Sequence, residues 1–109
     1  MKYNEDLENG MYDVCEQYIN GLNELLSWCR ELNITVDKIR FLHHGFQVLF
    51  DGMDGDAILH DGSYRHTRHY WETMGMPWDG DDVSTHDAYT LTHMIKTYQD
   101  GGDWEWYDN

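Results

Sequence analysis

Apolar and polar residues alternate along residues 38–51, which is the pattern of strands that are buried on one side. His44-Gly45 lies in the middle of this segment, and glycine tolerates the positive φ that a two-residue hairpin turn requires. Side chains two apart along a strand share a face, so this turn predicts one apolar face for the hairpin. The predicted cross-strand pairs are His43 with Phe46, Phe41 with Val48, and Ile39 with Phe50.

A third strand is predicted over residues 56–60, after a turn at residues 52–55. If Asp56 pairs with Asp51, Ala57 and Leu59 join the apolar face of the hairpin. The opposite face carries Leu42, Leu49 and Ile58 beside Arg40, Gln47 and His60. We therefore expect either the aromatic segment further along the chain or a partner chain to cover it.

An amphipathic helix is predicted over residues 10–32, because apolar residues recur there at the 3.6-residue period. The stripe consists of Met11, Val14, Cys15, Tyr18, Ile19, Leu22, Leu25, Leu26, Cys29 and Leu32. Asn33 is a suitable left-handed residue to end the helix. Gly21 is the weakest position of this helix, because glycine lowers helix stability by about 1 kcal/mol relative to alanine.

The segment after the third strand allows two interpretations, because residues 63–71 fit either a fourth strand or an ordered loop. Residues 73–82 predict a loop, since they contain two glycines, three aspartates and the only proline. A second helix is predicted to follow Ser84 as N-cap, with Asp87 completing a capping box, and to end at Gly101-Gly102. Residues 103–109 alternate charge with large aromatics, which suits an edge strand or docking on the sheet.

These elements together predict a single domain over residues 1–109 with an α+β fold. Its expected order is an N-terminal helix, a three- or four-stranded antiparallel meander and a C-terminal helix. The alternative architecture is a homodimer that buries Leu42, Leu49 and Ile58 between two sheets.

Charge narrows the functional classes, because 21 acidic and 7 basic residues give a formal net charge of −14. Nucleic acids and anionic membranes are polyanions, so the chain is not expected to bind either directly. The charge favours a basic partner, a cation, or solubility alone. Aromatic residues make up 15% of the chain, with five Trp and eight Tyr, which is too many for a disordered acidic tail.

The two cysteines, Cys15 and Cys29, are both placed on the first predicted helix. At about 1.5 Å rise per residue they lie about 21 Å apart, too far for a mutual disulfide. Buried free thiols are therefore expected, which suggests a reducing cytoplasm. The sequence shows no signal peptide and no apolar run long enough to span a bilayer.

Metal or catalytic chemistry has weaker support in the sequence. Asp51, Asp54, Asp56 and Asp61 cluster around a Gly-containing turn, but their spacing does not match a calcium-binding EF-hand loop. His66 and His69 are too few for a zinc site, which needs about four ligands. No nucleophile motif accompanies the serines or threonines. We predict no metal, no cofactor and no enzymatic activity, and keep as the alternative a metal-binding protein or small enzyme that uses His66, His69 and residues 51–61.

The acidic charge is concentrated in the last third of the chain, where Lys96 is the single base after Glu72. A row of carboxylates can imitate nucleic-acid phosphates, and interleaved Trp and Tyr residues can supply buried contacts at an interface. The predicted partner-binding residues are Asp79, Asp81, Asp82, Asp100, Asp103, Trp104, Glu105 and Trp106.

In size, charge and aromatic character, carried by residues 79–82 (DGDD) and 100–108 (DGGDWEWYD), the chain resembles small phage-encoded inhibitors of host defence, notably anti-CRISPR proteins. The resemblance is one of composition. It implies a protein of the host cytoplasm that binds a Cas effector and blocks its DNA-binding channel. The leading hypothesis is therefore an acidic inhibitor, monomeric or homodimeric, of a basic nucleic-acid-handling protein. A structural or accessory phage module is the other alternative.

Overall fold

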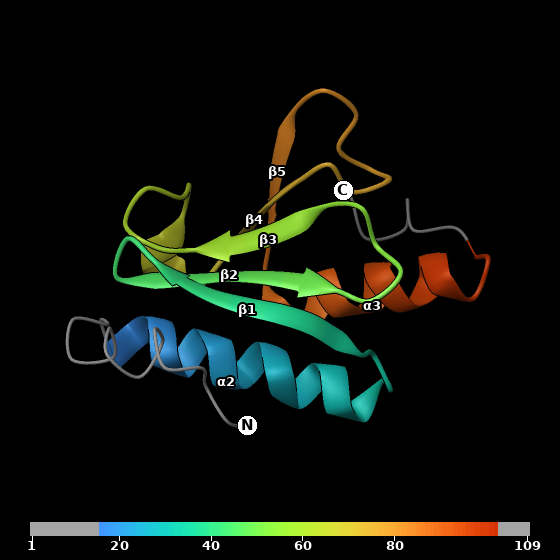
Figure 1. Cartoon of the computed structure of the whole chain (residues 1–109), viewed down its shortest axis with the longest axis horizontal. Coiled ribbons are helices and arrows are strands. Elements are labelled where there is room, and N and C mark those ends of the chain that lie inside the picture. The colour runs from blue at the N-terminus through green and yellow to red at the C-terminus, as the bar shows by residue number, and fades with distance from the viewer. Residues whose placement is uncertain (1–15, 103–109) are drawn as a thin grey trace.

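A curled five-stranded antiparallel sheet carries two helices on one side, as Figure 1 shows for the computed structural model, which describes residues 16–102. The strands follow one another in the order β1-β2-β3-β4-β5, with every neighbouring pair antiparallel. The elements are α2 (Glu16–Glu31), β1 (Val36–Leu42), β2 (Gly45–Phe50), β3 (Asp56–Leu59), the 3-10 helix η2 (His66–Arg68), β4 (Trp71–Met74), β5 (Val83–His86) and α3 (Ala88–Gln99). The predicted α+β class is confirmed, with more strands than the sequence indicated.

Helix α2 ends as the sequence predicts, because Asn33 takes a left-handed conformation with φ 57°. Gly21 is buried where α2 crosses β3, and an added Cβ would overlap Leu59 Cδ2. The glycine that weakens the isolated helix therefore permits the helix to approach the sheet closely. Residues 10–15 of the predicted helix, Cys15 among them, lie outside the described residues.

The β1–β2 turn differs from the prediction, because His43 and His44 occupy its two central positions with φ of 49° and 63°. Positive φ at both positions is the requirement of a type I′ turn. Gly45 lies instead in β2, where an added Cβ would overlap the carbonyl oxygen of Leu59 in the neighbouring strand. The predicted register is therefore wrong by two residues, and Phe41 pairs with Phe46.

A shift of two residues preserves the faces of a strand, so the predicted apolar face survives the change of register. The same shift affects β3, where Asp56 pairs with Leu49 and not with Asp51, while Ala57 and Leu59 are fully buried on the predicted face. One row of paired residues crosses the helix-covered side of the whole sheet: Ile39, Val48, Ala57, Thr73 and Ser84.

The segment between β3 and β4 is an ordered loop, which settles the alternative that the sequence left open. It contains η2, whose flanking residues Arg65 and His69 both have φ 58°. The fourth strand starts only at Trp71, and its last residues, Thr73 and Met74, fall in the segment that was predicted as loop.

The N-cap of the second helix was predicted one turn too early. Ser84 lies in β5, where it pairs with Thr73 across the sheet. Asp87 is the N-cap of α3, and its carboxylate accepts a 2.7 Å hydrogen bond from the backbone N–H of Thr90. The helix ends as predicted, with Gly101 at φ 79°.

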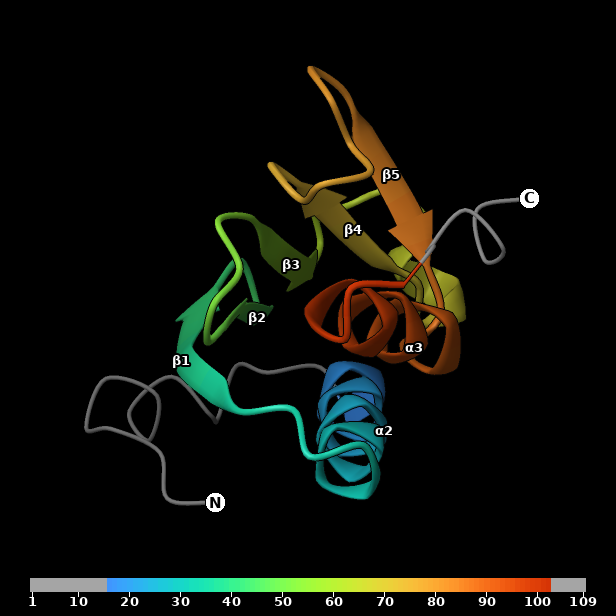
Figure 2. The same cartoon turned by 90° about the vertical axis from the view of Figure 1, so that its right-hand side faces the viewer.

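Both helices lie on the same side of the sheet and beside each other, as the end-on view of Figure 2 shows. Their inward side chains and the covered face of the sheet form one core, whose fully buried members include Tyr18, Leu22, Phe46, Trp71 and Leu91. None of the helices in the described part of the chain is long and apolar enough to cross a membrane.

On the side away from the helices, Leu42, Leu49 and Ile58 are half-buried, while Met74 and Val83 are exposed. The aromatic tail that was expected to cover this face, residues 103–109, lies outside the described residues.

Candidate functional site

One end of the sheet gathers acidic residues from three segments that are far apart in sequence. In an antiparallel meander alternate turns lie at the same end, and the register places Asp56 beside Met74 and Met74 beside Val83. The β2–β3 turn and the β4–β5 loop therefore lie at the same end of their strands, and the start of the loop lies beside the turn. The end of α3 reaches the same place, because Gln99 Nε2 donates a 3.2 Å hydrogen bond to the Asp51 carbonyl oxygen.

We call this region the acidic end. Its residues are all exposed: Asp51, Asp54, Asp81, Asp82 and Asp100. Lys96 is the base that contacts it, with Nζ 3.7 Å from Asp100 Oδ1. The other four carboxylates form no ion pair with a residue in the described range 16–102. The negative field at this end is therefore only weakly compensated by neighbouring bases.

Three of the predicted partner-binding residues, Asp81, Asp82 and Asp100, belong to the acidic end. Four others, Asp103, Trp104, Glu105 and Trp106, lie outside the described residues. Asp51 and Asp54 also belong to this surface, although their sequence context predicted only turn or metal residues. The signal that could have found them is the meander itself, since it places the β2–β3 and β4–β5 connections at one end.

Asp79 does not belong to this surface, which corrects its prediction as a partner-binding residue. It is 8% exposed, and its carboxylate accepts hydrogen bonds from Thr73 Oγ1 at 3.1 Å, from Ser84 Oγ, and from the backbone N–H of Met76 at 3.2 Å. A buried carboxylate with three donors ties the β4–β5 loop to both strands that it connects. Its role in the fold is structural.

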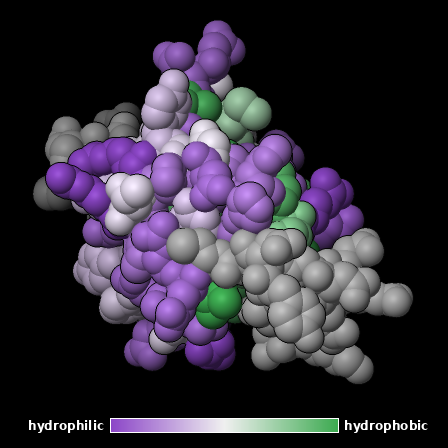
Figure 3. All heavy atoms as spheres, turned by 90° about the vertical axis from the view of Figure 1, so that its left-hand side faces the viewer, coloured by the Kyte–Doolittle hydropathy of each residue, from purple (hydrophilic) through white to green (hydrophobic). Residues whose placement is uncertain are grey.

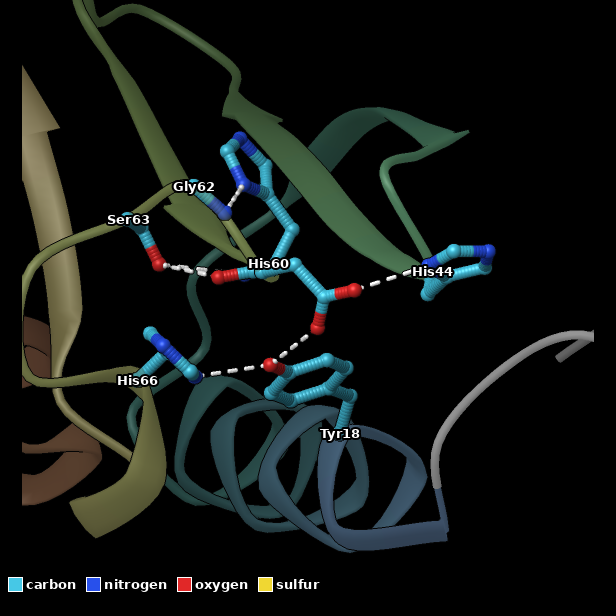
Figure 4. Close-up of polar contacts among 7 residues, drawn as sticks. Tyr18, His44, His60, Gly62, Ser63 and His66 are labelled. Atoms are coloured by element: carbon cyan, nitrogen blue, oxygen red, sulfur yellow. Dashed lines mark hydrogen bonds and ion pairs between the residues drawn. The ribbon is translucent and has the colours of Figure 1, made fainter.

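A second polar cluster lies at the opposite end of the sheet, around Asp61 (Figure 4). Tyr18 Oη donates a 2.7 Å hydrogen bond to Asp61 Oδ1, and His44 Nδ1 lies 2.8 Å from Asp61 Oδ2. The Tyr18 hydroxyl has one proton, which it donates to Asp61. The hydrogen bond between His66 Nδ1 and the phenol oxygen, 2.7 Å apart, is therefore donated by the imidazole N–H. The bonds from His44 and then from Tyr18 lower the pKa of Asp61 below its usual value.

His60 is the buried histidine of this cluster, at 6% exposure. Its Nδ1 accepts a 2.9 Å hydrogen bond from the backbone N–H of Gly62, and the ring of His43 packs edge-on at 5.0 Å. Burial first, and then the proximity of His43, lower the pKa of His60. Ser63 Oγ donates to the His60 carbonyl oxygen at 2.9 Å and is itself buried, so it is not presented to a substrate.

The predicted alternative of a metal site at His66 and His69 receives no support from their positions. His66 is engaged with Tyr18, and His69 ends η2 in a left-handed conformation. Across residues 16–102 no group of three or more His, Cys, Asp or Glu side chains is arranged to hold a metal ion. The hydrogen bonds around Asp61 instead connect α2 to the loop after β3. Figure 3 views this end of the molecule and shows a predominantly hydrophilic surface.

Cys29 is a buried thiol, as the sequence predicts. It is 2% exposed, and burial raises its pKa to about 12, against a smaller opposing effect of the Arg30 charge. A thiol in this environment stays protonated and is a poor nucleophile. Its predicted counterpart, Cys15, lies outside the described residues.

No family model matches the chain, and no curated protein or solved structure matches it.

Proposed function

We propose that the protein is a non-enzymatic inhibitor that binds a basic nucleic-acid-handling protein, of the class of the CRISPR effectors, and blocks its DNA binding. The observation that carries the proposal is the acidic end, where three segments remote in sequence present exposed carboxylates together. A net charge of −14 would repel the DNA that competes for the same partner. The resemblance of the whole chain to anti-CRISPR proteins in size and composition supports the choice of partner class.

Carboxylates that converge on one end of a fold can occupy a groove built for phosphates, because both present anionic oxygens to Lys and Arg side chains. Attraction between the negative field and a basic groove accelerates the encounter, and it weakens as salt is raised. The fold offers these carboxylates on two connections fixed by strand pairing and at the end of α3, so they need little ordering when the partner binds.

The test measures binding to purified CRISPR effectors loaded with guide RNA, in the presence and absence of duplex DNA. Asp81→Lys/Asp82→Lys changes the acidic end by four charge units. Glu16→Lys/Glu24→Lys changes the exposed face of α2 by the same amount and is the matched control. We expect at least one effector to bind the wild-type protein. Excess duplex DNA and raised salt should each displace the wild-type protein from that effector, and the acidic-end variant should not bind it.

Three results would contradict the proposal. Equal weakening by both variants would show that net charge alone matters and that the acidic end is no specific surface. Binding by no effector at low salt, or binding that duplex DNA does not displace, would remove the blocking of a DNA channel as the function.

A further inference from the structure

A small hollow lies within the acidic end, between the β2–β3 turn, the start of the β4–β5 loop and the end of α3. It is lined by Gly52, Met53, Asp54, Gly75, Pro77 and Tyr98, and its volume is about 160 Å³. At about 30 Å³ per water this is room for roughly five waters. Pockets for drug-sized ligands have about 300–1,000 Å³, so the hollow suits a single side chain and not a nucleotide.

The lining combines three kinds of group that together suit a long cationic side chain. Met53 and Pro77 offer apolar contact for an aliphatic stem, as Lys and Arg stems find at protein surfaces. Tyr98, a residue that is 39% exposed, adds an aromatic side chain to the lining, and aromatic rings attract cations. Asp54 supplies a carboxylate for the charged head.

The surroundings of the hollow are also acidic. Gln99 connects Asp51 to the end of α3, and Asp100 lies one turn beyond Lys96. The ammonium of Lys96 is directed toward Asp100, 3.7 Å away. A cation that enters the hollow thus meets Asp54 with two further carboxylates nearby.

The walls of the hollow are held by close backbone packing, so it exists before a ligand binds. Gly55 lies against the backbone of residues 74–76, and a Cβ added to it would lie 2.6 Å from the carbonyl carbon of Gly75. Gly75 itself has φ 79°, a conformation that glycine adopts without strain. Such contact fixes the β2–β3 turn against the β4–β5 loop and keeps the hollow open between them.

We infer that this hollow is a socket for an arginine side chain of the basic partner, an inference that rests on the proposed function and names the contact it uses. Arginine is favoured over lysine because its planar guanidinium can stack on Tyr98 while it donates two hydrogen bonds to the Asp54 carboxylate. The socket would fix the position of the partner, whereas the surrounding carboxylates supply long-range attraction.

The test is a titration of the intact, isotope-labelled protein with N-acetyl-arginine methylamide, followed through its backbone amide NMR signals. The matched probes are the corresponding lysine and norleucine amides. Both keep an aliphatic stem; lysine replaces the guanidinium with an ammonium group, and norleucine has no charged group. We expect saturable shifts that centre on Met53, Asp54 and Gly75, with arginine binding more tightly than lysine and norleucine causing none. Asp54→Asn should weaken arginine binding at least fivefold, while the control Glu24→Gln, on the exposed face of α2, should leave it unchanged.

The inference is overturned if no saturable shifts occur at the hollow, if norleucine causes the same shifts, if lysine binds more tightly than arginine, or if Asp54→Asn binds arginine as the wild type does. These outcomes are distinguishable from failure of the proposed function. Effector binding that depends on Asp81 and Asp82, without any arginine site at Asp54, removes the socket alone. If arginine binds at Asp54 but no effector binds the protein, the proposed partner class is wrong and the arginine socket stands.

Discussion

Tyr18 and Asp61, 43 residues apart in the chain, are joined by a 2.7 Å hydrogen bond from the phenol to the carboxylate. The bond links the buried face of α2 to the loop that follows β3. His66, from η2 of the same loop, and His44, from the β1–β2 turn, complete the arrangement. It is the clearest case in this protein of a polar network that only the tertiary structure assembles.

Tyr18→Phe should raise the pKa of Asp61 toward its ordinary value, because it removes one of the two hydrogen bonds that lower it. A lowered carboxyl pKa contributes stability above the unfolded value of about 3.9, and this stability is lost as pH falls through the folded pKa. Carboxyl NMR titration of Asp61 measures the change. Tyr64→Phe is the control, since Tyr64 is 68% exposed, and an unchanged Asp61 titration in Tyr18→Phe would contradict the assignment.

His60 should make the folded state less stable in mild acid. Its pKa is lowered, so below the unfolded value of about 6.5 the unfolded chain binds the proton more readily than the folded one. Its contribution to stability is present in full above that pH and decreases as pH falls toward the folded pKa. Urea unfolding at pH values between 8 and 5 measures this loss.

The matched variants for that measurement are His60→Asn and His69→Asn. An asparagine at position 60 keeps an acceptor for the Gly62 N–H but cannot titrate, so the acid-induced loss of stability should be smaller. His69→Asn is the matched control, because it removes a half-buried histidine. If both variants show the same curve, His60 is not the group responsible.

Glycine-to-alanine substitutions at positions 21 and 45 should lower the free energy of unfolding by unequal amounts. An alanine Cβ at position 45 would overlap the backbone carbonyl oxygen of Leu59, which cannot move without disturbing β3, so we expect a loss of about 2 kcal/mol or more. At position 21 the overlap is with the end of the Leu59 side chain, and about 1 kcal/mol of helix propensity partly offsets the repacking. Urea unfolding of both variants tests the order, and a larger loss at position 21 would contradict the packing described here.

Substitutions at Asp79 and Asp82 should change the free energy of unfolding by different amounts, because Asp79 is buried and Asp82 is exposed. Asp79→Ala removes the acceptor of three buried or half-buried donors and should destabilise the fold by about 3 kcal/mol. Asp82→Ala alters an exposed position and should change stability by less than about 0.5 kcal/mol. Thermal unfolding measures both, and an equal effect of the two substitutions would show that Asp79 has no special role in holding the loop.

The sequence by itself determined the elements whose evidence is local. The helical period of Tyr18, Leu22, Leu25 and Cys29 specifies the buried face of α2, and Asn33 and Gly101 mark helix ends by their tolerance of left-handed conformations. Alternation along β1 and β2 determined which side chains face the core, because a strand's faces survive a shift of two residues. The charge balance, too, is a property of the sequence alone.

The tertiary structure decided what depends on close approach between segments. Gly45 is used in a strand and not in a turn because the backbone of β3 passes against it, and this displaced the register. Ser84 and Asp79 resemble a helix cap and a surface acid in sequence, but strand pairing between β4 and β5 positions Ser84 to donate a hydrogen bond to the buried Asp79 carboxylate. The acidic end likewise exists only once the meander has placed Asp54, Asp81 and Asp100 at the same end of the sheet, because local patterns carry no information about which turns will meet.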